Sequence, residues 1–347
     1  MIQIRYDNPS KRDKLNEWYK GEIRQTLQEK QEDIVSPESG KVFQKLVAEL
    51  RKLTEQDIET ILLFPDVMPP PESGKRPFID DIIDKFKDTY PCLRAYIRAC
   101  NRAAARCDNE KTFQAEYPRL YQANEVIKKM FDYNSLGTKR LRELKERFGV
   151  PVCPYCNRQY IHTVEVGAKK PNLGDADHVL PKYIYQLFSL SLWNLAPSCM
   201  PCNRVFKGMK NGELLNPHLE GFDERCILEV RFHDVNALAG LDTSGTASNI
   251  DLQWTVQPEA DDDSRRRMEN NLSTFRLNEV YRFHREDVLV LLRKRYLTES
   301  DGYQTSLRRL HGVYLPDRSV LYGTSMNPLR FQEEPLSKMT YDVLEKN

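Results

Sequence analysis

Two short cysteine motifs, CPYC at residues 153–156 and CMPC at residues 199–202, decide the fold of the middle of this chain. Each motif allows two thiolates to meet one ion, and two such motifs supply the four sulfur ligands of a tetrahedral zinc site. A closed shell of four thiolates leaves no open position, so this metal would stabilise structure and would not catalyse. We therefore expect structural Zn²⁺ on Cys153, Cys156, Cys199 and Cys202.

The tetrapeptide CPYC is also the active-site motif of glutaredoxins, so a redox protein is an alternative. A redox cysteine pair is expected at the start of a helix in a βαβ unit. Here the motif precedes a β-like run at residues 160–166, a second cysteine motif follows, and no Thr-Val-Pro element occurs downstream. This context favours a metal site over a redox site.

The composition indicates an ordinary globular protein. The chain has 347 residues, of which 40% are hydrophobic and 30% are charged, enough for a substantial core and two or three domains. No run approaches the roughly 18 apolar residues of a membrane span, and residues 1–7 lack a basic-then-apolar leader. We therefore expect a cytoplasmic location, where paired cysteines more often bind metal than form disulfides.

Basic residues gather in the segment that carries the cysteine motifs. Residues 138–210 contain 12 Lys and Arg against 5 Asp and Glu, although the whole chain has a net charge of only +1. A basic segment of this kind suits a polyanionic partner, because neutralised phosphates drive nucleic-acid binding. On charge alone, a solvated helix face explains the segment equally well.

The hydrophobic pattern predicts an α+β chain that is mainly helical. Apolar residues at three- and four-residue spacings predict helices across most of residues 9–150, and alternation predicts strands at 227–232 and 250–256. Asn278 is a candidate N-cap for a later helix. We expect three regions: a helical N-terminal region at 1–135 for partner or substrate binding, a zinc-stabilised core at 136–220 and a mixed accessory region at 221–347.

Between and after the cysteine motifs lie three further strings: DADHVLPK at 175–182, WNLAPSC at 193–199 and CNRVFKG at 202–208. In this order they resemble the HNH, or ββα-metal, nuclease family, with Asp-His, then Asn, then Cys-x-x-Cys-Asn-x-x-x-Lys. The match covers roughly 60 of the 347 residues and includes the cysteines. The resemblance implies a ββα-metal core and a metal-dependent endonuclease that hydrolyses phosphodiester bonds, with DNA expected before RNA.

The resemblance also implies residue roles. Asp177 would bind a catalytic divalent cation and His178 would act as the general base, since an imidazole accepts a proton near neutral pH. Successive side chains of an extended chain point in opposite directions, so one can face the metal and the other the water. Asn194 would orient the loop that bears the base, or assist the metal.

The third motif position departs from the family pattern, because Asn203 stands where a His is more familiar. An amide oxygen is a hard, neutral ligand that suits Mg²⁺ or Mn²⁺. The change leaves the second ligand open, with His218 as an alternative. Lys207 would hold the scissile phosphate as a point charge, and Lys182 and Arg204 are either phosphate contacts or solvated charges.

More loosely, these strings are similar to the HNH nucleases of bacterial anti-phage systems of the Septu and retron-associated type. That similarity implies a defence effector with a separate ATPase subunit as partner. The lack of a Walker motif in this sequence is compatible with that arrangement and does not establish it. A single ββα-metal site cuts one strand at a time, so a double-strand break would need a homo-oligomer or two events. The alternative function is a zinc-stabilised nucleic-acid-binding module without catalysis.

Overall fold

The computed structural model describes residues 1–6, 9–34, 43–65, 82–86, 88–164, 166–167, 171, 173–242, 246–311 and 318–347. These residues fall into two compact units. The first unit consists of Met1–Arg5, Pro151–Tyr160 and Glu220–Asn347, and the second consists of Tyr6–Val150 and Ile161–Leu219. The division at residues 135 and 220 that the sequence suggests stays a prediction.

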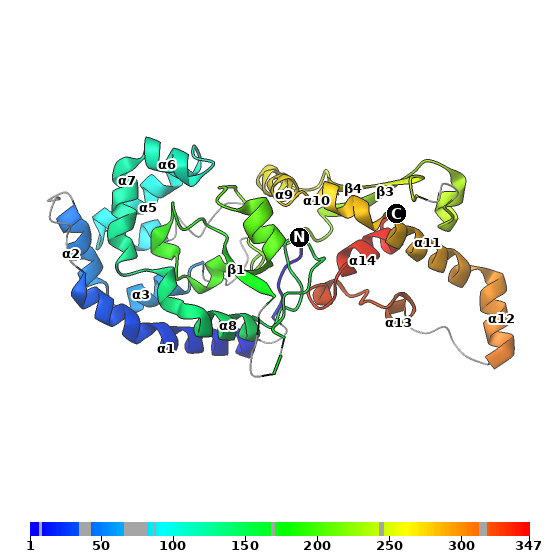
Figure 1. The fold of residues 1–347 in the computed structure, drawn as a ribbon, viewed down its shortest axis with the longest axis horizontal. Helices are drawn as coiled ribbons and strands as arrows, with labels where there is room; N and C mark the ends of the chain where they lie inside the picture. The colour runs from blue at the N-terminus through cyan, green and yellow to red at the C-terminus, as the bar shows by residue number, and fades with distance from the viewer. Residues whose placement is uncertain are drawn as a thin grey trace. The chain divides into compact units, whose positions relative to one another are not determined.

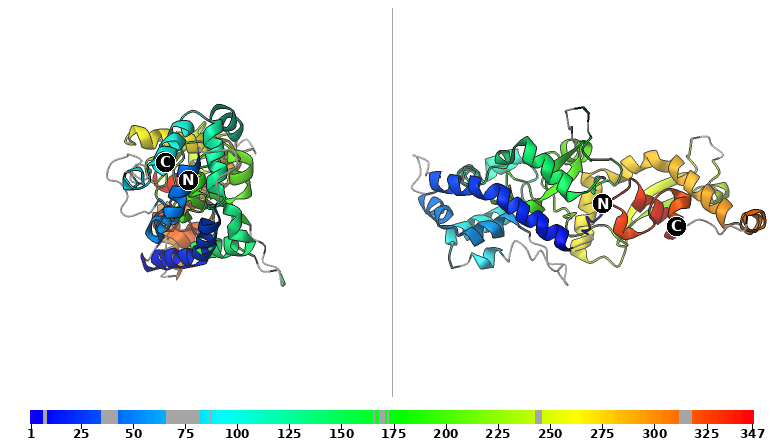
Figure 2. Two further views of the ribbon diagram at one scale, coloured as in Figure 1. Left: turned by 90° about the vertical axis from the view of Figure 1, so that its left-hand side faces the viewer. Right: turned by 90° about the horizontal axis from the view of Figure 1, so that it is seen from below.

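The second unit is mainly helical. Its helices are α1 (Pro9–Asp33), α2 (Gln44–Lys52), α3 (Glu55–Leu62), α5 (Pro91–Ala104), α6 (Glu110–Glu116), α7 (Pro118–Lys128) and α8 (Gly137–Phe148). In α1, the buried residues Leu15, Tyr19, Ile23 and Leu27 recur every four positions, so they form one face. Helix α1 lies beside α8 (Figures 1 and 2).

Local sequence explains where several of these helices begin and end. Thr54 and Asp57 form a capping box at the start of α3. Pro118 starts α7, because proline lacks the amide hydrogen that a helix interior needs, and it therefore separates α7 from α6. Helix α8 ends at Gly149, which has the left-handed φ of 64°.

A short hairpin-like sheet completes the second unit. Strand β1 (Gly174–His178) pairs antiparallel with β2 (Leu195–Cys199), so that Asp177 lies opposite Ala196. Three short 3₁₀ or π segments surround it: η3 (Gln186–Phe188), η4 (Leu192–Asn194) and η5 (Pro201–Lys207), the last being a π-helix. Gly174 fits because a Cβ there would lie 2.9 Å from the Ser198 carbonyl oxygen across the sheet.

The first unit contains a second antiparallel pair, β3 (Cys226–Phe232) and β4 (Ile250–Val256). Its helices are α9 (Asp262–Thr274), α10 (Leu277–Tyr281), α11 (Arg285–Glu299), α12 (Asp301–His311), α13 (Arg318–Tyr322) and α14 (Ser337–Glu345). Helix α14 packs on β3 and on α11 (Figures 1 and 2). The amide of Leu228 in β3 donates to the buried Asp342 carboxylate of α14 (3.0 Å).

The mainly helical α+β class and the strands at 227–232 and 250–256 are confirmed. No named strand covers the described residues of 160–166, where Tyr160 forms only an isolated bridge with Val152. Asn278 as an N-cap is wrong: it lies inside α10, and its side-chain oxygen accepts a hydrogen bond from the Trp254 amide (2.7 Å). No helix among the described residues is long and apolar enough to cross a membrane.

Candidate metal centre and active site

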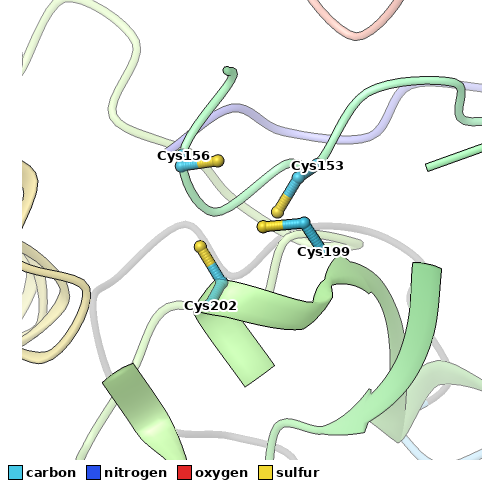
Figure 3. Close-up of side chains that lie close together, drawn as sticks. All are labelled: Cys153, Cys156, Cys199 and Cys202. Atoms are coloured by element: carbon cyan, nitrogen blue, oxygen red, sulfur yellow. The ribbon is translucent and has the colours of Figure 1, made fainter. Parts of the chain in front are cut away.

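The four motif cysteines converge. Their sulfur atoms all lie within 4.8 Å of one another, and all four residues are buried. Figure 3 shows the four side chains pointing toward a common point. A tetrahedral zinc ion about 2.3 Å from each sulfur would place the sulfurs about 3.8 Å apart. The cluster formed by Cys153, Cys156, Cys199 and Cys202 can therefore hold a zinc ion, as the motif spacing predicts.

The first cysteine motif lies in a turn. The Asn157 amide donates to the Cys153 carbonyl (2.8 Å), and the Cys153 amide donates to the carbonyl of Gln159 (2.9 Å). Both thiols therefore sit on one tight loop. A redox CPYC motif would start a helix, so this turn geometry favours the metal site.

Asn157, directly after the first motif, fixes this loop from within its own unit. It is buried and has a left-handed φ of 50°, a conformation that Asn tolerates better than most residues. Its side-chain nitrogen donates to the carbonyls of Phe331 (3.0 Å) and Glu334 (3.2 Å). Its side-chain oxygen accepts from the Lys338 amide (3.0 Å), and its carbonyl accepts from the Leu336 amide (2.6 Å). One side chain thus anchors the loop to residues 331–338.

The second cysteine motif begins the segment that carries the other candidate residues. Cys199 ends β2, and Cys202 lies in η5 together with Asn203, Arg204 and Lys207. The π-helix ends at Gly208, whose φ is 53°. Because Asn203 directly follows a cysteine of the cluster, a metal bound there would also fix the position of η5.

Asp177 and Lys207 form a buried ion pair. The Lys207 Nζ atom lies 2.8 and 2.7 Å from the two carboxylate oxygens of Asp177, and both side chains are about 95% buried. The same ammonium group donates to the His178 carbonyl oxygen. Lys207 therefore holds the end of β1 in this structure, a position different from the phosphate contact that the sequence suggests.

His178 has a defined tautomer. Its Nε2 atom lies 2.9 Å from the Ser189 carbonyl oxygen, which can only accept, so Nε2 carries the proton and Nδ1 is the basic nitrogen. The ring packs edge-on against Tyr133, with centroids 4.6 Å apart. Burial lowers the pKa of His178 to about 3, since the nearby Ser189 carbonyl only partly offsets the desolvation of the charged form. The imidazole is therefore neutral at physiological pH.

Asn194 fastens the loop that follows His178. Its side-chain oxygen accepts from the Leu180 amide (2.7 Å), and its side-chain nitrogen donates to the carbonyls of Phe188 (3.0 Å) and Leu180 (3.2 Å). Its own carbonyl accepts from the Val179 amide (2.9 Å). The fully buried Asn194 thus occupies a position that orients the loop and does not line the adjacent pocket.

Asp175, two residues before Asp177, accepts hydrogen bonds from the side chains of both Asn203 and Arg204. Arg204 donates to both of its carboxylate oxygens (2.7 and 2.7 Å), and the Asn203 side-chain nitrogen donates to one of them (3.2 Å). Partial burial opposes ionisation, but these hydrogen bonds outweigh it and hold the pKa of Asp175 below its ordinary value. Asn203 thus faces Asp175.

These groups surround a hollow of about 370 Å³ in the second unit. Most of the candidate residues line it: Asp177, His178, Lys182, Asn203, Arg204 and Lys207. His218 does not. It is buried elsewhere, with Nε2 3.0 Å from the Leu195 carbonyl oxygen and its ring 5.2 Å from that of Trp193.

The lining residues that were not sequence-based candidates include four with polar or charged side chains beside the candidates: Tyr133, Lys145, Asp175 and Lys210. Asp175 had a signal, because strand residues two positions apart share a face and Asp177 was already a candidate. Lys145 lies on α8, and Tyr133 lies in the preceding 3₁₀ segment η2 (Tyr133–Leu136). Neither segment carries a sequence motif. The Lys145 ammonium donates to the Gly174 carbonyl (2.7 Å), and burial holds its pKa below the ordinary value.

The lining contains five basic side chains, Lys145, Lys182, Arg204, Lys207 and Lys210, against two carboxylates. The oxygen donors of Asp175, Asp177 and Asn203 are of the hard type that Mg²⁺ and Mn²⁺ prefer, so the residues fit such an ion in kind. A cation bound to Asp177 would have to displace the Lys207 ammonium group or share the Asp177 carboxylate with it.

No family model, no curated protein and no solved structure matches this chain.

Proposed function

We propose that this chain is a metal-dependent HNH-type endonuclease that hydrolyses phosphodiester bonds, with DNA as the expected substrate before RNA. The observation that carries the proposal is the neutral His178 with its proton fixed on Nε2, beside a hollow lined by basic side chains. Such a ring is unprotonated and can accept a proton from a water molecule that attacks a phosphate held by those charges. The negative charge of a bound phosphate favours the protonated imidazole and so opposes the lowering of its pKa by burial.

In this mechanism each residue has a distinct task. Nδ1 of His178 accepts the proton of the attacking water, and the Ser189 carbonyl and the Tyr133 ring keep the imidazole in place. Lys182 and Arg204 bind the phosphate oxygens. To do so, Arg204 gives up its ion pair with Asp175 and donates to the phosphate. Asn194 positions the loop after the base.

A divalent cation would be held by Asp177 or Asp175 together with Asn203. When bound, Mg²⁺ or Mn²⁺ would stabilise the charge that develops on the phosphate and on the leaving oxygen. The zinc cluster would hold η5, and with it Asn203, in position. The anti-phage setting and the ATPase partner rest on the sequence resemblance and stay predictions.

The competing candidate is a zinc-stabilised module that binds nucleic acid without cutting it. The same basic lining supports binding, and the paired state of Asp177 with Lys207 is compatible with a purely structural role. This alternative gives no task to a neutral His178 beside the hollow.

The test is nicking of supercoiled plasmid, and cleavage of a folded RNA, with Mg²⁺ or Mn²⁺. We expect divalent-dependent cleavage by the native chain and a loss of at least about 100-fold in His178→Ala, the size of a general-base contribution. The control is His233→Ala, an exposed histidine in the other unit. Equal cleavage by His178→Ala would refute the assignment of the base, and tight binding without cleavage under every condition would favour the binding module.

A further inference from the structure

Helix α11 exposes an apolar stripe on the first unit. Phe283 lies in η7 (Arg282–His284), the 3₁₀ turn that leads into the helix, and Val290 and Leu297 lie within α11. They are 83%, 47% and 52% exposed, and they follow one another at seven-residue intervals. Seven residues make almost two helical turns, so these side chains lie along one line. The opposite face is buried, through Val288, Leu289, Leu291 and Leu292.

The charges beside this stripe are arranged symmetrically about Val290. Glu286 and Asp287 lie one turn before it and Arg293 and Lys294 one turn after it, all exposed. At roughly 100° per residue, Glu286 and Arg293 fall on one flank of the stripe, and Asp287 and Lys294 fall on the other.

This pattern is complementary to itself under a two-fold axis through Val290. In an antiparallel pair of α11 helices, Phe283 of one chain meets Leu297 of the other. Glu286 then faces Arg293 of the second copy, and Asp287 faces Lys294. A parallel pair would place acid against acid and base against base, which opposes association.

Within the described part of the chain, the stripe and its flanking charges stay exposed, although two of the charged side chains have partners in the same unit. Arg293 donates through Nε and Nη2 to the Gly240 carbonyl (3.1 and 2.8 Å), which holds the guanidinium at the helix surface. Asp287 lies 2.7 Å from His284, yet its side chain is 57% exposed. The adjacent segment η6 (Val235–Ala239) adds exposed Val235 and Leu238 beside α11.

We propose that α11 is a homodimer interface, in which two copies of this chain pair antiparallel about Val290. The apolar stripe supplies the buried core of the interface and the two acid–base pairs on each side set the direction. This inference does not depend on the nuclease assignment, because it uses no residue of the hollow or of the cysteine cluster.

The experiment measures the molar mass of the intact chain by sedimentation between about 0.1 and 100 μM, the range of weak to moderate dimers. We expect a concentration-dependent dimer. Val290→Asp places two carboxylates face to face on the axis and should raise the dissociation constant at least about tenfold. The matched control is Val320→Asp, since Val320 is an exposed valine (71%) on α13 of the same unit.

The orientation is tested by charge exchange. Lys294→Glu places Glu opposite Asp287 twice per dimer and should weaken association about tenfold, whereas Asp287→Lys combined with Lys294→Glu should restore it to within about threefold. A monomer at 100 μM, or a dimer insensitive to Val290→Asp, would overturn the proposal. A dimer that Val290→Asp breaks but the double exchange does not rescue would overturn the antiparallel arrangement. Circular dichroism on every variant separates loss of pairing from loss of folding.

Discussion

Segment η5 contributes Cys202 to the cysteine cluster and Asn203 and Lys207 to the basic hollow, yet the two sites differ in composition, burial and charge. The cluster joins four identical, buried sulfur donors within 4.8 Å. The hollow joins unlike groups: two carboxylates, an amide, an imidazole and five basic side chains, several of them partly exposed. A saturated, uniform site can only hold its ion, whereas a mixed and accessible site can bind and react.

In and beside the hollow, the same contrast separates residues that fix structure from residues that can meet a substrate. Asp177, Lys207 and Asn194 are buried and fully engaged with neighbouring groups. Arg204 is 63% exposed and pairs with the carboxylate of Asp175.

Loss of the cluster should have the largest effect. Cys199→Ser should abolish binding of one zinc per chain and unfold the region around it, because structural zinc contributes roughly 10 kcal/mol or more in small domains, comparable to the whole stability of a protein. Elemental analysis and thermal melts check this. Cys92→Ser, outside the cluster, should keep both zinc and melting temperature. Full zinc occupancy in Cys199→Ser would contradict the four-sulfur site.

Breaking the buried ion pair should come next. Lys207→Met leaves Asp177 charged and buried without its partner, which costs about 3–5 kcal/mol. Urea unfolding measures the loss. Lys210→Met, an exposed lysine of the same hollow, should cost little. The double variant Asp177→Asn with Lys207→Met should recover part of the loss; an unaltered stability of Lys207→Met would mean that the pair is not formed.

The loop of the first cysteine motif should depend on Asn157. Asn157→Ala removes the side-chain bonds to residues 331–338 and leaves Ala at a φ of 50°, a combined cost of about 2–4 kcal/mol. Asn157→Gly keeps the backbone conformation at low cost, so it should be the milder variant. Urea unfolding and zinc retention in the presence of a chelator measure both. Equal effects of the two variants would exclude a contribution from backbone strain.

Acid should destabilise the chain partly through His218. Burial lowers the pKa of this ring to about 4, so the folded state keeps it neutral while the unfolded chain protonates near pH 6.5. The unfolded state then binds more protons below pH 6.5, and stability falls by about 2 kcal/mol by pH 5. Protonation of the zinc-binding cysteines also destabilises the folded chain in acid. We therefore measure melting temperature against pH for the native chain and for His218→Phe, and compare the two slopes. Identical slopes would contradict the prediction.

The sequence reveals those parts of the site that depend on spacing along the chain. Paired Cys-x-x-Cys motifs predict the cluster because the two pairs together supply four sulfur ligands to a single ion. The hydrogen bonds of Asn194 fasten the loop after His178, and its role in catalysis stays a prediction. The sequence does not predict the partners of Asp177 and Asn157. The partner of Asp177 depends on how η5 turns toward β1, and the partners of Asn157 lie in residues 331–338, far along the chain. Likewise, only coordinates reveal that Asn203 faces Asp175.

The most direct test measures zinc content, melting temperature and plasmid nicking on one preparation of His178→Ala beside the native chain. The account predicts one zinc per chain in both, a melting temperature within a few degrees of native for this partly exposed residue, and nicking reduced at least about 100-fold. Unchanged nicking by a variant that retains its zinc would contradict the assignment of cluster and hollow to separate tasks.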